Sequence, residues 1–203
     1  MPRVLDILKQ VGALLTDDHF VGTSGRHIGT YINKDMLFPH TAVTSEVCAM
    51  FAERHAHLPI DVVAAPAMGG IILSQWTAYH LSKMTGREIL SVYAEKKNNV
   101  LTFTRGYDSY VHGKKVLVIE DLTTTGGSLQ AVIELVRRAG GEPIAASVMV
   151  NKDPKQVTQE TVGVPFSPLA EVEVASYDAS ECPLCKQGVP VNTTIGHGKN
   201  FLA

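Results

Sequence analysis

The sequence has few cysteines and no long apolar run. Three cysteines among 203 residues are too few for the framework of a disulfide-stapled domain. No apolar stretch approaches the ~20 residues of a membrane span. The apolar N-terminal stretch carries Asp6 and Lys9, and no small-residue cleavage site follows it, so we expect no signal peptide. These absences predict a reduced, cytoplasmic protein.

An excess of charge of either sign is also missing. The 18 Lys and Arg residues nearly balance the 20 Asp and Glu residues, which leaves a formal net charge of −2. Bulk charge therefore disfavours a nucleic acid or an anionic membrane as partner, and any attraction for an anionic substrate must be local. With 45% hydrophobic residues, the chain is long enough to bury one substantial core.

Short apolar runs alternate with amphipathic stretches along most of the chain. We expect helices over 3–15, 41–56, 69–86 and 127–141, and strands over 60–65, 88–96, 115–121 and 143–150. The alternation predicts an α/β fold with a mainly parallel central sheet flanked by helices. We expect a single domain, 1–203, with an N-terminal segment (1–40, containing a short strand near Tyr31), a core (41–150) and a C-terminal edge and tail (151–203).

The stretch VLVIEDLTTTGGS, residues 116–128, passes from a strand whose apolar run ends at Ile119 through two acids into hydroxyls and glycines. Ligands of open parallel sheets bind beyond the carboxyl ends of the strands. Glycines and hydroxyls at a helix start suit a phosphate, whereas an acid pair suits sugar hydroxyls or a cation. The pattern indicates a ribose 5-phosphate site; a plain capping loop with solvated acids is the alternative. The expected site residues are Glu120, Asp121, Leu122, Thr123, Thr124, Thr125, Gly126, Gly127 and Ser128.

Two further loops follow expected strands. In APAMGGIIL, residues 65–73, the backbone amides near Gly69 and Gly70 open a helix and suit an anion, although such a loop is often only a turn. The segment 95–113 is too long for a simple connection, and functional lids commonly have such length. It is basic and alternates apolar and polar residues, so we expect a hairpin; a solvated basic hairpin without function is the alternative.

The acid pair and its glycine-rich loop closely resemble the phosphoribosyl-pyrophosphate (PRPP) signature of type I phosphoribosyltransferases. The resemblance implies that a nitrogenous base displaces pyrophosphate from Mg²⁺-bound PRPP, with Mg²⁺ held in part by Glu120 and Asp121 through water. It implies a pyrophosphate loop and a hood loop, 95–113, that closes over PRPP and often reaches the partner subunit of a homodimer. The implied pyrophosphate-loop residues are Ala67, Met68, Gly69 and Gly70, and the implied catalytic residues are Lys96, Lys97, Arg105 and Asp121.

The segment GTSGRHIGTYINKD and the tail YDASECPLCKQGVP are similar to the orotate phosphoribosyltransferases of one bacterial and archaeal branch. This similarity implies orotate as the acceptor and residues 1–40 as the base-binding segment. Two departures are Thr23, where the family commonly has lysine, and Lys152, where many members have arginine. Transfer to another base and a non-catalytic PRPP-sensing regulator are the alternatives. The implied base contacts are Ser24, Gly25, Arg26, Tyr31, Thr124 and Lys152.

The tail carries a possible metal site. Cys182 and Cys185, in CPLC, could bind zinc together with His197, but a tetrahedral site needs four ligands. Cys48 falls in an expected helix and suits the core, while Asp178 is a speculative fourth ligand. The interpretation we favour is a reduced, structural cysteine pair in a turn of the tail.

Overall fold

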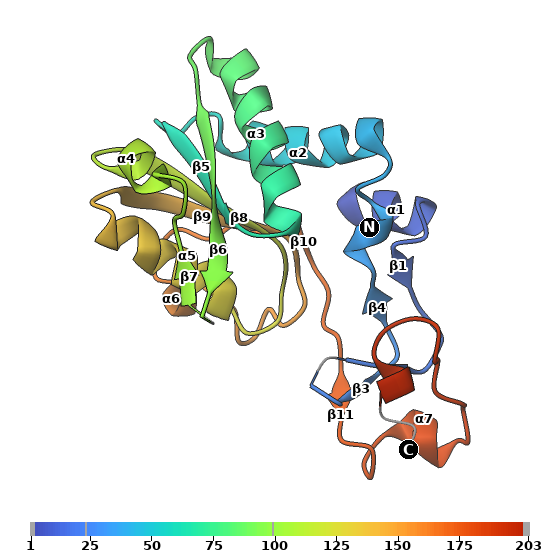
Figure 1. The fold of residues 1–203 in the computed structure, drawn as a ribbon. Coiled ribbons are helices and arrows are strands. Elements are labelled where there is room, and N and C mark those ends of the chain that lie inside the picture. The colour runs from blue at the N-terminus through green and yellow to red at the C-terminus, as the bar shows by residue number, and fades with distance from the viewer. Residues whose placement is uncertain (1–2, 23, 99, 201–203) are drawn as a thin grey trace.

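A six-stranded sheet forms the centre of the larger part of the molecule (Figure 1). The computed structural model describes residues 3–22, 24–98 and 100–200. Neighbouring strands run parallel except at one edge, where β7 pairs antiparallel with β6. In their order across the sheet, the strands are β10 (Ala170–Glu171), β9 (Glu142–Asn151), β8 (Lys115–Thr123), β5 (Val62–Pro66), β6 (Leu90–Lys97) and β7 (Val100–Thr102).

Helices cover both faces of this sheet. Leu117 and Ile119 of β8 pack into a core shared with three helices, one of them at the start of the chain, while Val116 and Val118 pack into a second core on the other face. The alternation follows from the two-residue period of a strand, and it explains why the run is continuously apolar. The fold class is as expected. The helices around the sheet are α2 (Thr41–His55), α3 (Gly69–Thr85), α4 (Tyr107–Val111), α5 (Gly127–Arg138) and α6 (Gln159–Val162).

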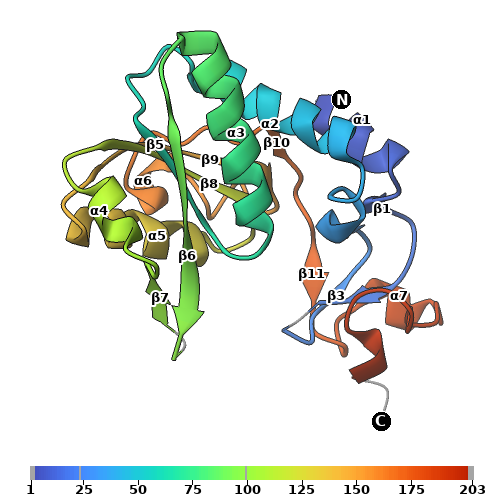
Figure 2. The ribbon, with the colours of Figure 1, turned by 45° about the horizontal axis from the view of Figure 1, so that its top comes forward.

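A smaller lobe lies beside the sheet and combines segments from both ends of the chain (Figures 1 and 2). Its three-stranded sheet has the order β11-β3-β2, with both pairs antiparallel. A short two-stranded ladder, β1 with β4, connects this lobe to the start of the chain. The elements of the lobe are β2 (Phe20–Val21), β3 (His27–Ile28), β11 (Ser176–Tyr177), α7 (Pro183–Lys186) and η2 (Gly198–Asn200). The remaining elements of the N-terminal segment are α1 (Arg3–Gln10), β1 (Leu14–Leu15), β4 (Tyr31–Ile32) and η1 (Lys34–Met36).

Most expected elements are present, with two corrections. The first helix ends at Gln10 rather than near residue 15, because Gly12 takes a left-handed conformation (φ 71°) and Ala13 N–H donates to Leu8 O at 2.7 Å. The following leucines pair with β4 instead. The strand β8 continues to Thr123, two residues beyond the expected segment 115–121, because its ladder with β9 persists to Asn151.

The expected hairpin is confirmed by the β6–β7 pairing, and the short strand near Tyr31 is β4. The tail contributes β10 to the edge of the main sheet and β11 to the smaller lobe. In the parts of the chain that the structure describes, no helix has both the length and the apolar character needed to cross a bilayer.

Candidate functional site

The acid pair lies at the carboxyl end of β8, the strand between β5 and β9. Asp121 is 8% exposed, and its Oδ1 accepts a hydrogen bond from Leu122 N–H at 2.6 Å. Its Oδ2 pairs with Lys34 Nζ at 3.0 Å. Glu120 is half-buried beside it. Both carboxylates therefore belong to a structured edge of the sheet and not to a solvated loop.

The loop between β5 and α3 lies directly against Asp121. Its backbone begins with Ala67 N–H donating to Ala94 O at 2.8 Å, and the Ala67–Met68 peptide is cis. A Cβ at Gly69 would overlap Oδ2 of Asp121, so this approach requires glycine. Gly70 is equally confined, since its Cβ would lie 2.7 Å from that of Ala65. The start of α3 thus places its unpaired backbone amides next to the acid pair.

The loop after β8 is ordered by its own hydroxyls. Thr123 Oγ1 accepts a hydrogen bond from Gly126 N–H at 2.9 Å, and Gly126 has a φ of 77°. The helix α5 begins at the next residue. Thr124, Thr125, Gly127 and Ser128 are exposed, so the hydroxyls of this loop are accessible to a ligand, while Gly127 N–H donates to Thr125 Oγ1 at 3.5 Å.

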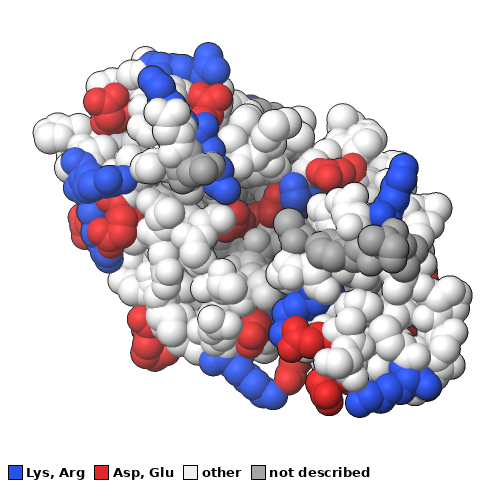
Figure 3. Space-filling model, turned by 60° about the horizontal axis from the view of Figure 1, so that its bottom comes forward, with Lys and Arg blue, Asp and Glu red and all other residues white. Residues whose placement is uncertain are grey.

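A cavity of about 570 Å³ lies between this loop and the smaller lobe. Five of the six expected base contacts line it: Ser24, Arg26, Tyr31, Thr124 and Lys152. The Arg26 guanidinium is held by Ser176, through its Oγ at 3.1 Å and its carbonyl at 2.8 Å, and by Asp178 at 3.0 Å. Thr23 lies outside the described residues. Figure 3 shows a hollow between the two parts of the molecule, where acidic side chains lie beside a basic one.

The expected hood residues lie on and beyond the β6–β7 hairpin. Lys96 and Lys97 are exposed at the end of β6. Arg105, in the loop that follows β7, pairs with Glu95 at 3.4 Å. The hydroxyl of Thr104 also donates to Glu95. Among the described residues that line the cavity there is no hood cation, so in this arrangement the hairpin stands away from it.

Burial and neighbouring charges shift the pKa values of three residues of the site, Glu120, Lys152 and Lys34. Burial, reinforced by the charge of Asp121, raises the pKa of Glu120 to about 8, against the opposing effect of Lys34 and Lys96. Burial lowers the pKa of Lys152, which Asp121 partly offsets. For Lys34, burial acts to lower the pKa, but the carboxylates of Asp121 and Asp35 outweigh it, so the pKa lies above its usual value.

Lys34 is the site residue that the sequence analysis missed. Its Nζ is 3.0 Å from Asp121 and lies 3.1 Å from the position that a Cβ of Gly69 would occupy. It therefore joins the acid pair to the glycine loop. The lysine follows the Tyr31–Ile32 strand directly in INKD, but nothing local in that pattern indicates which distant strand it meets.

The tail cysteines are not among the residues that line the cavity between the smaller lobe and the loop after β8. Cys182 and Cys185 meet His19 and His27, so His197, the expected third ligand, is not one of the four clustered side chains in the described part of the chain. Cys48 is buried in α2, as expected.

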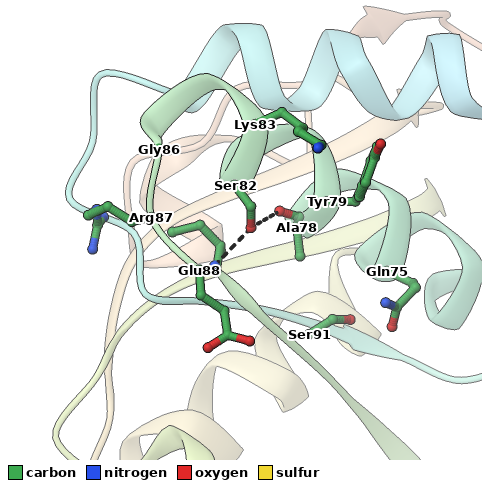
Figure 4. Close-up of a pocket in the computed structure, with 10 residues that line it drawn as sticks. Gln75, Ala78, Tyr79, Ser82, Lys83, Gly86, Arg87, Glu88 and Ser91 are labelled. Carbon is green, nitrogen blue, oxygen red and sulfur yellow. Dashed lines mark hydrogen bonds between the residues drawn. The ribbon is translucent and has the colours of Figure 1, made fainter.

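Another hollow lies at the opposite end of α3, beside the start of β6 (Figure 4). Ser82 ties its wall together, since its Oγ donates to Ala78 O at 2.8 Å and accepts from Ile89 N–H at 2.9 Å. Lys83, Arg87 and Glu88 lie around it. Because it is at the amino end of β6, it is remote from the carboxyl edge where ligands of such sheets bind.

Comparison with known proteins identifies the family. The model of the phosphoribosyl transferase domain matches residues 33–166. The chain is similar to orotate phosphoribosyltransferases of Chlorobium phaeobacteroides, with 39% identity over 94% of this chain and 93% of that protein, and of Thermotoga maritima, with 35% identity over 96% and 98%.

Solved structures support the same fold. The crystal structure of Mycobacterium tuberculosis orotate phosphoribosyltransferase in complex with Fe(III) dicitrate is similar with a TM-score of 0.67 and 20% identity, covering 84% of this chain and 97% of that one. For the enzyme from Aeropyrum pernix the TM-score is 0.64 and the identity 24%, over 84% and 94% of the two chains. The chain therefore belongs to the phosphoribosyltransferase family, alongside these orotate phosphoribosyltransferases.

Proposed function

We propose that this protein transfers the phosphoribosyl group of PRPP to orotate, releasing orotidine 5′-monophosphate and pyrophosphate in pyrimidine biosynthesis. The observation that carries the proposal is the contact between the acid pair of β8 and the Gly69–Gly70 loop, beside a cavity that contains cationic side chains. The names of relatives at 35–39% identity support orotate as the acceptor.

On the donor side, three groups of atoms match three parts of PRPP. The amides and hydroxyls of residues 123–128 suit the 5′-phosphate, and Glu120 and Asp121 suit the ribose hydroxyls. The amides at the start of α3, with Lys34 Nζ beside them, suit the pyrophosphate. As the bond from C1′ to oxygen breaks, its electron pair leaves with pyrophosphate, and a nitrogen of orotate bonds to C1′. The protein's part is to neutralise the leaving group and position the base.

On the acceptor side, orotate is a planar anion. Lys152 and Arg26 provide positive charge for its carboxylate, while Ser24, Gly25 and Thr124 offer polar groups to its ring edge. Tyr31 offers a ring face for stacking. Lysine in place of the family's common arginine keeps the charge but loses the two-pronged hydrogen-bonding geometry of a guanidinium. As the ring nitrogen of orotate bonds to C1′ it loses its proton, which passes to water or to an oxygen of the departing pyrophosphate.

The acid pair also fits Mg²⁺. Carboxylate oxygens are ligands that this hard cation accepts, often through water. Glu120 and Asp121 are consecutive in β8, directly before Leu122, which lines the cavity. When bound with PRPP, Mg²⁺ supplies positive charge to the leaving pyrophosphate. Asp121 is paired with Lys34, and this contact fixes the position of its carboxylate.

The hood and a second subunit complete the proposal. We propose a homodimer in the cytoplasm, in which the hairpin brings Lys96 or Lys97 to the pyrophosphate, with Arg105 released from Glu95. Met68, Ile72 and Tyr79 form an exposed apolar stripe along α3. Because the stripe begins beside the glycine loop, a second copy seated on it would lie next to the site.

The choice of acceptor is tested by measuring pyrophosphate release from PRPP and Mg²⁺ with orotate, uracil, adenine, guanine and hypoxanthine. We expect release with orotate alone, because only orotate among these bases carries a carboxylate for Lys152 and Arg26. Release with a different base only would overturn the acceptor, and no release with any base would favour a PRPP-sensing regulator. As a control, Asp121→Asn should cut turnover by about 100-fold or more while leaving a folded protein.

Lys34→Gln should lower kcat/KM for PRPP by roughly 10- to 100-fold, since it removes a cation placed beside the acid pair and the glycine loop. Lys34→Arg should recover part of the loss. The measurement is steady-state kinetics at varied PRPP concentration, with Lys83→Gln, at the remote end of α3, as the matched control. An unchanged kcat/KM in Lys34→Gln would remove this residue from the site.

Glu120→Gln should stabilise the free protein at pH 8 by about 1–3 kcal/mol, allowing roughly 1.4 kcal/mol per unit of pKa and a discount for partial exposure. The folded-state pKa of about 8 lies above the unfolded value near 4.5. Between these values the unfolded chain loses a proton that the folded chain keeps, so stability falls as pH rises. Urea unfolding at pH 5 and pH 8 measures the effect, which should shrink at pH 5. Glu88→Gln is the exposed control, and an equal gain at both pH values would contradict the assignment.

Tyr79→Glu together with Ile72→Glu should convert the proposed dimer into a monomer, because two charges would be buried in the apolar interface. Light scattering coupled to size-exclusion chromatography measures the mass. Gln159→Glu, which alters an exposed residue on α6, outside both α3 and the hood, should leave the dimer intact. A wild-type protein that runs as a monomer at all concentrations sinks this part of the proposal.

A further inference from the structure

Four side chains from the two ends of the chain meet inside the smaller lobe. His19 and His27 come from the N-terminal segment, and Cys182 and Cys185 come from the tail. Their ligand atoms all lie within 4.8 Å of one another. We propose that these four residues bind one structural zinc ion, separate from the site for PRPP and the base.

The distances between ligand atoms suit a tetrahedral centre. His19 Nε2 lies 3.7 Å from Cys182 Sγ and 3.8 Å from Cys185 Sγ, and His27 Nδ1 lies 3.4 Å from Cys185 Sγ. Zinc bonds of about 2.3 Å to sulfur and 2.0–2.1 Å to nitrogen place such atoms roughly 3.5 Å apart around a tetrahedron. The two nitrogens, at 2.7 Å, need to separate by only about half an ångström to reach the spacing of roughly 3.3 Å.

The outer contacts of His19 orient it for a metal. Its Nδ1 lies 2.8 Å from the carbonyl oxygen of Val189, an acceptor that places the ring proton on Nδ1. The lone pair of Nε2 then faces the other three ligands. The backbone carbonyl of His19 is also fixed, by Asn192 N–H at 2.7 Å. A hydrogen bond from the ring nitrogen that does not bind the metal is typical of histidines that bind zinc.

The cysteines are arranged as a compact metal-binding turn. Cys182 directly precedes α7 and is fully buried, and Pro183 starts that short helix. The spacing of two residues between the thiols is common among structural zinc sites, and two thiolates with two imidazoles are a closed zinc ligand set. A hydrogen-bonded histidine pair beside two free thiols is the competing interpretation, and it gives no reason for all four groups to converge.

The lobe also needs a stabilising link. Phe20 and Val21 are buried in it, yet they belong to neither of the two cores that flank the main sheet. A unit with so small an apolar core commonly depends on a metal or a disulfide. Zinc would join segments more than 150 residues apart in the sequence. It would also fix β3, and the residue directly before that strand, Arg26, contacts Ser176 and Asp178. The ion's role is therefore to hold the wall of the base cavity in place.

The test is the zinc content of the full-length protein, purified under reducing conditions, treated with a chelating resin and measured by mass spectrometry of the elements. We expect about one zinc per chain. Cys182→Ser combined with Cys185→Ser should reduce this to about one-tenth or less, whereas the matched control Cys48→Ala, which removes a buried thiol from α2, should keep it. Fewer than about 0.1 zinc per wild-type chain, an undiminished content in the double variant, or iron in place of zinc would overturn the proposal.

Cobalt substitution keeps the test decisive if the double variant fails to fold. Wild-type protein stripped of metal and loaded with Co²⁺ should show thiolate-to-cobalt charge-transfer absorption and the intense visible bands of a tetrahedral centre. Removal of the metal should raise hydrogen exchange in residues 19–28 and 176–186 and leave β5, β8 and β9 protected. Absence of the cobalt bands, or a disulfide between Cys182 and Cys185 in the freshly purified protein, would contradict zinc binding.

Discussion

The carboxylate of Asp121 lies so close to the backbone of Gly69 that no side chain fits between them. This contact depends on the parallel pairing of β5 with β8, in which Val62 aligns with Val116, because parallel strands bring their carboxyl ends to one edge. The glycine loop of one strand and the acid pair of the next are thereby adjacent. The cavity, the helix starts and the lysine that joins them are arranged around this approach.

The acid pair at this edge lowers the stability of the free protein at neutral and higher pH. Burial beside Asp121 holds Glu120 at a pKa of about 8, which means that its charged form is disfavoured until positive charge arrives. Lys34 partly supplies such charge through its pairing with Asp121 at 3.0 Å. A site that destabilises the free protein and is stabilised by its ligands is expected where a polyanion and a cation bind together.

The smaller lobe shows how the two ends of the chain cooperate. Arg26 meets Ser176 and Asp178, and His19 meets the tail cysteines, across separations of 150 residues or more. The cavity lies between this lobe and the loop after β8, so its shape depends on how firmly the two ends of the chain are joined. Zinc at the four clustered ligands would provide that firmness where the lobe has little apolar core of its own.

The sequence alone determined the alternation of strands and helices, the acid pair with its glycine-rich loop, and the β6–β7 hairpin, because these depend on local periodicity and turn chemistry. It did not determine that β8 runs on to Thr123, since that length depends on pairing with β9. Only the tertiary structure decided that Lys34 faces Asp121 and that His19 and His27 meet the cysteines. The physical reason is that such contacts join segments far apart in the chain, and they arise from packing that no local pattern encodes.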